Sequence, residues 1–212
     1  MSNHWDFPSI STYRGPRSFE VPYVLNNIED GSILEIGANK SLLKWAILRR
    51  GEKYTLIDPL GTEFKGAEEL DHISQLTGDI RKQKSRRLGK FDNVILMSTL
   101  EHIGLPGYRQ KENWKKWGSK RKAQLWTFRH CMSFVKDNGI MICTLPYKRH
   151  NSTINNNLIR YSRQMVDDLQ KGFTLVDEKI FAQTDKRLDR WMEVKDEETN
   201  KRRANICFVI RK

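Results

Sequence analysis

Residues 32–61 constrain the fold more than any other part of the sequence, because two short apolar segments flank a segment with helical periodicity. SILEIG and KYTLID are typical of buried strands. Between them, SLLKWAILRR places Leu43, Ala46 and Ile47 on one face of a helix and ends in basic residues, which the helix dipole favours there. A strand, a helix and a second strand predict two parallel strands joined by a right-handed crossover.

The same alternation of strand-like and helix-like segments continues through the rest of the chain. It predicts an α/β fold with a doubly wound, mostly parallel sheet of seven strands. The connection at residues 182–203 is long and charge-balanced, so we expect the last two strands to pair as a hairpin and the C-terminal strand to be antiparallel. Beyond residue 61 the predicted strands lie at 72–79, 91–98, 139–146, 173–181 and 205–212.

Residues 1–30 precede the first strand and contain RSFEVPYVLNNI, which predicts a leading helix. With 212 residues, the chain can form one domain with a sizeable core and a small extension. We therefore expect an N-terminal helical cap or lid at residues 1–30 and a single larger domain at residues 31–212.

The net charge of +12 is concentrated in two basic windows. Residues 81–90 contain six basic residues and no acid, and residues 108–122 contain seven basic residues and one acid, Glu112. Such windows are typical of surfaces that attract nucleic acid, anionic lipid headgroups or phosphorylated substrates, and equally of an ordinary solvated face on a basic protein. Charge alone leaves both interpretations open.

No apolar run approaches the ~20 residues needed to cross a bilayer, and the N-terminal residues contain no apolar signal-peptide core. Three cysteines, Cys131, Cys143 and Cys207, lie in apolar surroundings and are expected to be thiols of the core. They form no Cys-x-x-Cys pair and no histidines cluster, so no metal site is predicted. We expect a cytoplasmic protein without a transmembrane segment.

Several of the predicted strands end in residues that suit a nucleotide ligand. In an open parallel sheet, ligands bind beyond the carboxyl ends of the strands, near the point where the strand order reverses. A glycine there lets a ligand approach the backbone, and an acid after the second strand can bind both ribose hydroxyls. Each of these residues also has a simpler interpretation as a turn residue or a helix cap, but their common order and spacing favour a site. They are Gly37, Asp58, Asp79 and Ser98.

The segments around these residues resemble class I S-adenosylmethionine-dependent methyltransferases. FDNVILMSTLEHIG is closely similar to the family's fourth-strand motif, including the pair Glu101 and His102. LEIGANKS resembles the first cofactor motif, in which Glu35 and Gly37 match, and Asp58 matches the ribose-binding acid. The resemblance covers most of the chain and implies a Rossmann-like methyltransferase fold with S-adenosylmethionine as the cofactor.

Asn39 and Ser41 occupy positions at which the family usually has glycine. Asparagine tolerates the left-handed conformation and serine can cap the following helix, so the turn can still form. The departure also motivates a different hypothesis, a non-catalytic binding module that kept the fold and lost the cofactor, against which the retained Asp58 and Asp79 argue. The resemblance implies cofactor contacts from Glu35, Gly37, Ala38, Asn39, Ser41, Asp58, Pro59, Asp79, Ile80 and Ser98.

The resemblance also implies direct transfer of the sulfonium methyl group to a hydroxyl or an amine of the acceptor. His102 is the candidate base, with Glu101 as its orienting partner, although helix capping or packing would explain the same pair. Tyr13, Tyr147 and Tyr161 are alternative contacts for the acceptor.

The sequence leaves the acceptor open. Similar sequences, often associated with glycan or surface-polymer synthesis, imply a glycan, lipid-linked or small-molecule acceptor. The basic windows at 81–90 and 108–122 favour a nucleic acid, RNA in particular, whose bases could stack on Trp114, Trp117 and Trp126. STLE follows the fourth strand, where many base-amine methyltransferases carry Asn/Asp-Pro-Pro-Tyr/Phe. The missing motif makes a nucleic-acid acceptor a weaker alternative without removing it.

Overall fold

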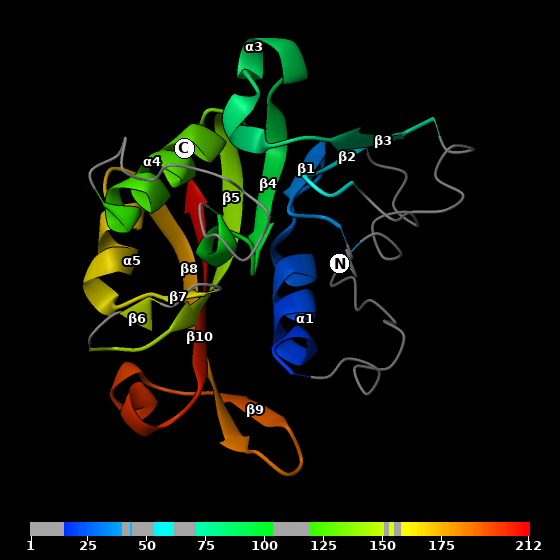
Figure 1. Cartoon of the computed structure of the whole chain (residues 1–212). Helices are drawn as coiled ribbons and strands as arrows, with labels where there is room; N and C mark the ends of the chain where they lie inside the picture. Colours follow the sequence, from blue (N-terminus) through cyan, green and yellow to red (C-terminus); the bar gives the residue numbers. More distant parts are fainter. Residues whose placement is uncertain are drawn as a thin grey trace.

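The computed structural model describes residues 15–39, 43, 53–61, 71–103, 119–150, 153–154 and 158–212. These residues form an eight-stranded sheet with the order β3-β2-β1-β4-β5-β10-β8-β9 (Figure 1). Its strands are β1 (Ile33–Ile36), β2 (Tyr54–Asp58), β3 (Ile73–Thr77), β4 (Phe91–Met97), β5 (Val135–Tyr147), β8 (Thr174–Asp185), β9 (Arg190–Glu193) and β10 (Ala204–Arg211). A two-stranded sheet consists of β6 (Thr153–Ile154) and β7 (Ile159–Arg160). The helices are α1 (Arg17–Asn27), α3 (Ser85–Leu88), α4 (Lys120–Met132) and α5 (Arg163–Gln170), with 3₁₀ helices η3 (Ile80–Lys82), η4 (Leu100–His102) and η7 (Asp196–Lys201).

The pairing of the strands confirms the predicted fold class. β1 is parallel to β2 and β4, β2 is parallel to β3, and β4 is parallel to β5. The pairs β5–β10, β10–β8 and β8–β9 are antiparallel. β9 lies in the connection at residues 182–203 and adds an eighth strand that the sequence did not predict. The strand order reverses between β1 and β4, where open α/β sheets bind their ligands.

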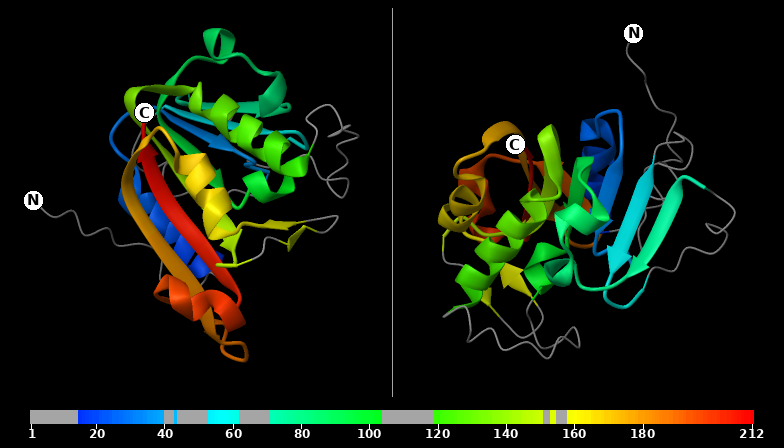
Figure 2. Two further views of the ribbon diagram at one scale, coloured as in Figure 1. Left: turned by 90° about the vertical axis from the view of Figure 1, so that its left-hand side faces the viewer. Right: turned by 90° about the horizontal axis from the view of Figure 1, so that it is seen from above.

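The sheet is covered on both faces, as Figure 2 shows for α1 on one side and α4 and α5 on the other. Alternate side chains of β4 pack on opposite faces of the sheet. Val94 and Leu96 pack in the cluster that contains residues of α4 and α5, whereas Ile95 and Met97 pack in the cluster that contains residues of α1. Burial on both faces explains why these strands are nearly continuous apolar runs in the sequence.

The helix α1 confirms the predicted leading helix, and Glu20 fixes it to the sheet. The Glu20 side chain is fully buried. Its Oε1 atom accepts hydrogen bonds from Ser98 Oγ at 2.6 Å, Thr144 Oγ1 at 2.9 Å and Asn205 Nδ2 at 3.0 Å. Its Oε2 atom accepts from Arg17 Nη1 at 2.9 Å. A buried carboxylate requires such partners, so α1 packs where these donors converge.

Three predicted strands differ from the structure in their limits by more than one residue. The third ends at Thr77 because Asp79, expected at its end, instead caps η3 with its side chain. The fifth begins earlier than predicted, at Val135, because the chain already pairs with Phe91 of β4 there. The sixth, predicted to end at residue 181, continues to Asp185 because it pairs with β9 there. The helix predicted after β1 lies almost entirely outside the described residues.

Among the helices of the described residues, none is long and apolar enough to cross a membrane. The cytoplasmic location stays a prediction, as does the division into a cap at residues 1–30 and a domain at residues 31–212. The three cysteines are buried free thiols, as the sequence predicted.

The variant Glu20→Ala is expected to lower the free energy of unfolding by roughly 3 kcal/mol, because several donors of the core lose their acceptor at once. Urea unfolding followed by circular dichroism measures the change. Glu29→Ala is the matched control, since Glu29 forms an exposed ion pair with Arg211 and its loss should cost less than about 1 kcal/mol. Equal losses in the two variants would contradict the anchoring role of Glu20.

Candidate functional site

A cavity of about 260 Å³ lies at the carboxyl ends of β1, β2 and β4, where the strand order reverses. The ends of these strands, the start of η3, and residues from α1 and η4 line it. The lining residues are Arg17, Glu35, Ile36, Gly37, Asn39, Ile57, Asp58, Pro59, Leu60, Gly78, Asp79, Ile80, Met97, Ser98, Thr99, His102 and Ile103.

Most of the residues predicted from the sequence to contact a cofactor meet in this cavity. Ala38 is buried but is not among the lining residues, and Ser41 lies outside the described residues. Arg17 and Thr99 line the cavity without having been predicted. The predicted residues that line it are Glu35, Gly37, Asn39, Asp58, Pro59, Asp79, Ile80 and Ser98.

Gly37 forms the turn out of β1 and cannot be replaced without strain. Its φ is +83°, in the left-handed region that side chains disfavour. A Cβ atom there would lie 2.3 Å from Thr99 Oγ1, so the segment after β4 packs directly on the glycine. The Gly37 N–H donates to the carbonyl oxygen of Ile57 at 2.9 Å, which ties the turn to β2.

Asp58 is held at the end of β2 by backbone donors from two loops. Its Oδ1 atom accepts from the Leu60 N–H at 2.7 Å, and Oδ2 accepts from the Asn39 N–H at 3.3 Å. The Asn39 side chain then donates through Nδ2 to the carbonyl oxygen of Gly61 at 2.8 Å. Burial raises the pKa of the Asp58 carboxyl, and the two N–H groups oppose that shift. Asn39, in place of the usual glycine, therefore links the turn after β1 to the turn after β2.

Asp79 is paired with Arg81, a residue of the basic window at 81–90. Asp79 Oδ1 accepts from the Arg81 backbone N–H at 3.0 Å and from Nε at 2.9 Å, and Oδ2 accepts from Nη2 at 2.6 Å. Burial acts to raise the pKa of Asp79, but the hydrogen bonds and the charge of Arg81 outweigh it and hold the pKa below its ordinary value. Asp79 is thus both the predicted helix cap and an ionised acid on the cavity.

Ser98 connects the cavity to α1. Its φ of +47° is unusual for a residue other than glycine, and its N–H donates to Thr144 Oγ1 at 2.9 Å. Its hydroxyl donates to Glu20, which also accepts from Arg17. This arrangement brings the Arg17 guanidinium to the cavity wall. The signal that could have found Arg17 is the RSFE segment, in which an arginine and an acid lie one helical turn apart.

Glu35 and Tyr54 form a buried pair beneath the Gly37 turn. The Glu35 side chain is almost fully buried and accepts a hydrogen bond from the Tyr54 hydroxyl. Because the hydroxyl comes from β2, this contact orients the acid of the first motif within the sheet.

His102 lines the cavity and Glu101 lies beneath it. His102 Nε2 is 3.9 Å from Glu101 Oε1, and Glu101 is buried. Within the described residues, Glu101 Oε2 has no hydrogen-bond partner. Burial raises the pKa of Glu101 to about 8, and the charge of Glu20 adds to the shift. The carboxyl is therefore mostly protonated at neutral pH.

The tyrosines predicted as acceptor contacts have other partners. The Tyr147 hydroxyl donates to Asp196 Oδ1 at 2.6 Å, and the buried Tyr161 hydroxyl donates to Gln124 Oε1. Neither is among the lining residues. Tyr13 lies outside the described residues, so its role stays a prediction.

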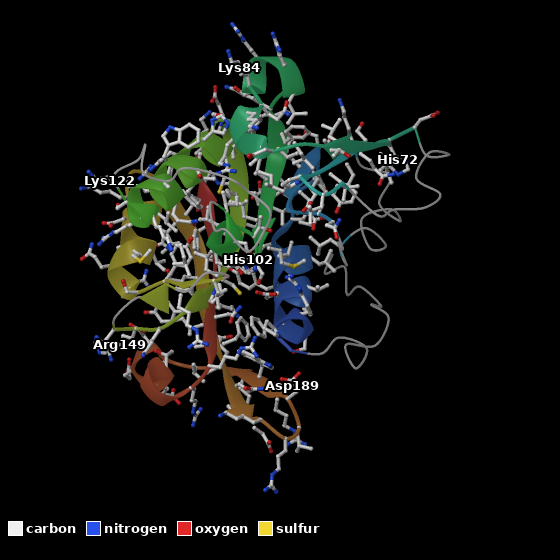
Figure 3. All side chains as sticks on the ribbon, viewed as in Figure 1. His72, Lys84, His102, Lys122, Arg149 and Asp189 are labelled. Atoms are coloured by element: carbon white, nitrogen blue, oxygen red, sulfur yellow. The ribbon has the colours of Figure 1, made fainter. Side chains whose placement is uncertain are left out.

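Within the first basic window, Arg81 pairs with Asp79 on the cavity, whereas Lys84 lies away from His102 (Figure 3). Residues 81–90 include η3 and α3, and Figure 3 shows Lys84 at the end of the molecule remote from His102. Of the window at residues 108–122, only residues 119–122 are described.

Of the three tryptophans considered for base stacking, only Trp126 lies in the described residues. It is 37% exposed on α4, and its ring stacks on His130 with 5.1 Å between ring centroids. Trp114 and Trp117 lie outside the described residues.

Comparison with solved structures identifies the fold. 1,6-Didemethyltoxoflavin-N1-methyltransferase of Burkholderia thailandensis, with its acceptor and S-adenosylhomocysteine bound, is 10% identical with a TM-score of 0.65, over 96% of this chain and 81% of that chain. Coclaurine N-methyltransferase, bound to N-methylheliamine and S-adenosylhomocysteine, is 11% identical with a TM-score of 0.65, over 92% and 70%. This chain has the class I S-adenosylmethionine-dependent methyltransferase fold. The resemblance predicted from the motifs is confirmed at the level of the fold.

The methyltransferase fold does not by itself fix the reaction. The [4+2]-cyclase SpnF is 14% identical with a TM-score of 0.62, over 91% of this chain and 79% of that chain. No protein-family model and no curated protein matches the sequence. Activity therefore has to be argued from the residues of the site.

The raised pKa of Glu101 predicts a pH dependence of stability. A carboxyl with a pKa of 4.5 when unfolded and about 8 when folded stabilises the protein fully below pH 4.5, and this contribution is lost as the pH rises toward 8. Glu101→Gln should therefore become progressively more stable than the wild type between pH 5 and pH 8. Urea unfolding at several pH values measures the difference. The exposed control Glu29→Gln should keep the wild-type slope, and an unchanged slope in Glu101→Gln would refute the assignment.

Proposed function

We propose that the protein is an S-adenosylmethionine-dependent methyltransferase that methylates a hydroxyl or an amine of a small molecule or a glycan, free or lipid-linked. The observation that carries the proposal is the pair of acids, Asp58 and Asp79, on one cavity above the Gly37 turn. Such an arrangement suits a nucleoside bound at the carboxyl end of a parallel sheet, where an acid hydrogen-bonds the ribose hydroxyls. Bound S-adenosylmethionine supplies an activated methyl group, so the protein has to position two reactants and exclude water.

Asp58 and Asp79 suit the two ends of an adenosine. Asp58 accepts only two backbone hydrogen bonds among the described residues, so its remaining lone pairs are available to both ribose hydroxyls. Asp79 is kept ionised by Arg81, and its Oδ2 atom, with one hydrogen bond among the described residues, can accept from the adenine amino group. Ile80 and Leu60 add apolar walls to this end of the cavity.

Arg17 and Glu35 suit the amino-acid end of the cofactor, which carries one charge of each sign. The Arg17 guanidinium can bind a carboxylate through two N–H groups, and a carboxylate oxygen of Glu35 can accept from an ammonium. Both residues line the same cavity, and Gly37 allows the ligand to approach the backbone between them.

His102 is the residue that can take the proton from the acceptor. It lies on the cavity after β4, and a base is needed for a hydroxyl acceptor and for an amine that arrives protonated. The protonated Glu101 lies 3.9 Å from the imidazole, Oε1 to Nε2, and adds no full negative charge beside it.

Other candidate functions have less support. Lys84, in the window at residues 81–90, lies at the end of the molecule remote from His102 (Figure 3), so a polyanion bound around Lys84 would not be presented to the candidate base. The molecules bound beside S-adenosylhomocysteine in the two methyltransferase structures, 1,6-didemethyltoxoflavin and N-methylheliamine, are small molecules. A non-catalytic module is disfavoured because Asn39, in place of the glycine, makes a hydrogen bond that links both cofactor loops.

Asp58→Ala is expected to weaken the binding of S-adenosylhomocysteine at least tenfold, because hydrogen bonds to a charged group are worth about 1.5–3 kcal/mol. Isothermal titration calorimetry measures the dissociation constant. The control Asp137→Ala removes a highly exposed carboxylate and should bind as the wild type does. An undiminished affinity in Asp58→Ala would remove the main support for the cofactor site, and no binding by the wild type would overturn the proposed function.

His102→Ala is expected to lower methyl transfer by about 10²–10⁴-fold while leaving the affinity for S-adenosylhomocysteine within about twofold, because a general base contributes to the chemical step. Transfer of a labelled methyl group to fractionated cell extract measures the rate and isolates the acceptor. The exposed His150→Ala is the matched control. Full transfer by His102→Ala would exclude this residue as the base.

A further inference from the structure

We propose that the β8–β9 hairpin is a positioning element of the active site, which acts through α1 to hold Arg17 at the cavity. Trp191, which is not among the cavity-lining residues, would then control the binding of the amino-acid end of the cofactor. The inference rests on the proposed function, in which Arg17 binds the cofactor carboxylate.

The hairpin grips α1 through aromatic packing. The ring of Phe19 stacks on Phe181 of β8, with 4.4 Å between centroids and 16° between ring planes. The same ring packs against Trp191 of β9, with 5.1 Å between centroids. Trp191 is itself held by Arg203, whose guanidinium carbon lies 5.7 Å from the indole centroid. The Phe19 side chain, which projects from α1, is therefore buried against both strands of the hairpin.

A polar contact joins the tip of the hairpin to the chain just before α1. Asp189 lies in the turn between β8 and β9 with a φ of +49°. Its carboxylate accepts hydrogen bonds from the Gly15 N–H, from Gln183 Nε2 at 2.8 Å and from Trp191 Nε1 at 3.1 Å. One side chain thus fixes the turn, the indole and the entry to α1, and Figure 1 shows β9 beside that end of the helix.

The hairpin contacts with Phe19 lie two residues from Arg17 along α1, so they help to set the position of Arg17. Successive residues of a helix are about 100° apart, so Arg17 and Glu20 lie on one side of α1, where they form an ion pair, and Phe19 projects from the opposite side. Phe19 packs on the hairpin, Glu20 binds the buried donors of the sheet, and Arg17 reaches the cavity. With Phe19 and Glu20 fixed, the rotation of α1 is fixed, and Arg17 has only its own side chain to order when a carboxylate binds.

The additional strand β9 provides a large part of this support. Without β9, Phe19 would lose one of its two ring contacts within the described residues and keep the one with Phe181, and the entry to α1 would lose its bond to Asp189. A purely structural hairpin would affect overall stability, but it would not discriminate between ligands that do and do not reach Arg17.

Calorimetry with two ligands tests the inference. The probes are S-adenosylhomocysteine and 5′-methylthioadenosine, which has the adenosine but lacks the amino-acid carboxylate. Trp191→Ala should weaken S-adenosylhomocysteine about tenfold and leave 5′-methylthioadenosine within about twofold of the wild type. Trp191→Phe should largely restore the affinity, and the exposed Leu188→Ala in the same turn should have no effect.

A double-variant comparison separates the possible failures. In an Arg17→Gln background, Trp191→Ala should produce no further loss of S-adenosylhomocysteine binding, because both changes act on one contact. Equal losses for the two ligands, or no loss, would overturn the role of the hairpin. Normal binding of S-adenosylhomocysteine by Arg17→Gln would overturn it as well, while leaving the proposed methyltransferase intact. If Trp191→Ala does not fold, Asp189→Asn replaces it in the same comparison.

Discussion

The buried carboxylate of Glu20 is the interaction on which the arrangement of this molecule depends. It accepts from the end of β4, from β5, from β10 and from Arg17, so one group joins the N-terminal helix to strands that are far apart in the sequence. A charge can remain in the core only if its lone pairs are satisfied, and this requirement fixes α1 against the sheet. The cavity wall contributed by α1 therefore follows from the packing of the core.

The two acids on the cavity are held by different donors, and their pKa values shift in opposite directions. Asp58 is held by backbone N–H groups, and burial raises its pKa, whereas Asp79 is held by Arg81, which lowers its pKa. Among the described residues Asp58 accepts two hydrogen bonds, which under the proposed function leaves lone pairs for the ribose hydroxyls. Asp79 stays ionised, which strengthens a hydrogen bond from an amino group.

The sequence predicted those features that depend on strand period and chain order. Parallel strands bring their carboxyl ends together, so Gly37 and Asp58 could be assigned to one edge before any contact was known. It did not predict Arg17, Arg81 or the strand β9. A charged residue in a helix or in a basic window looks solvated in the sequence, and only contacts made after folding bring it to the cavity. β9 was missed because its residues are mostly exposed and lack the apolar alternation of a covered strand.

Two parts of the structure build the cavity: the sheet, which belongs to the fold, and α1 and η4 with the β8–β9 hairpin packed on α1. We expect specificity for the acceptor to arise in the second part. The sheet and its first two loops build the half of the cavity suited to adenosine, and this half could serve any reaction of the fold, including the one carried out by the cyclase SpnF. α1, η4 and the hairpin supply Arg17, His102 and the support behind them. Under the proposed function the methyl group is transferred at that end, so a change of acceptor is expected to need changes in these elements and not in the sheet. Residues that pack on α1 from outside the cavity can then alter specificity without touching either ligand.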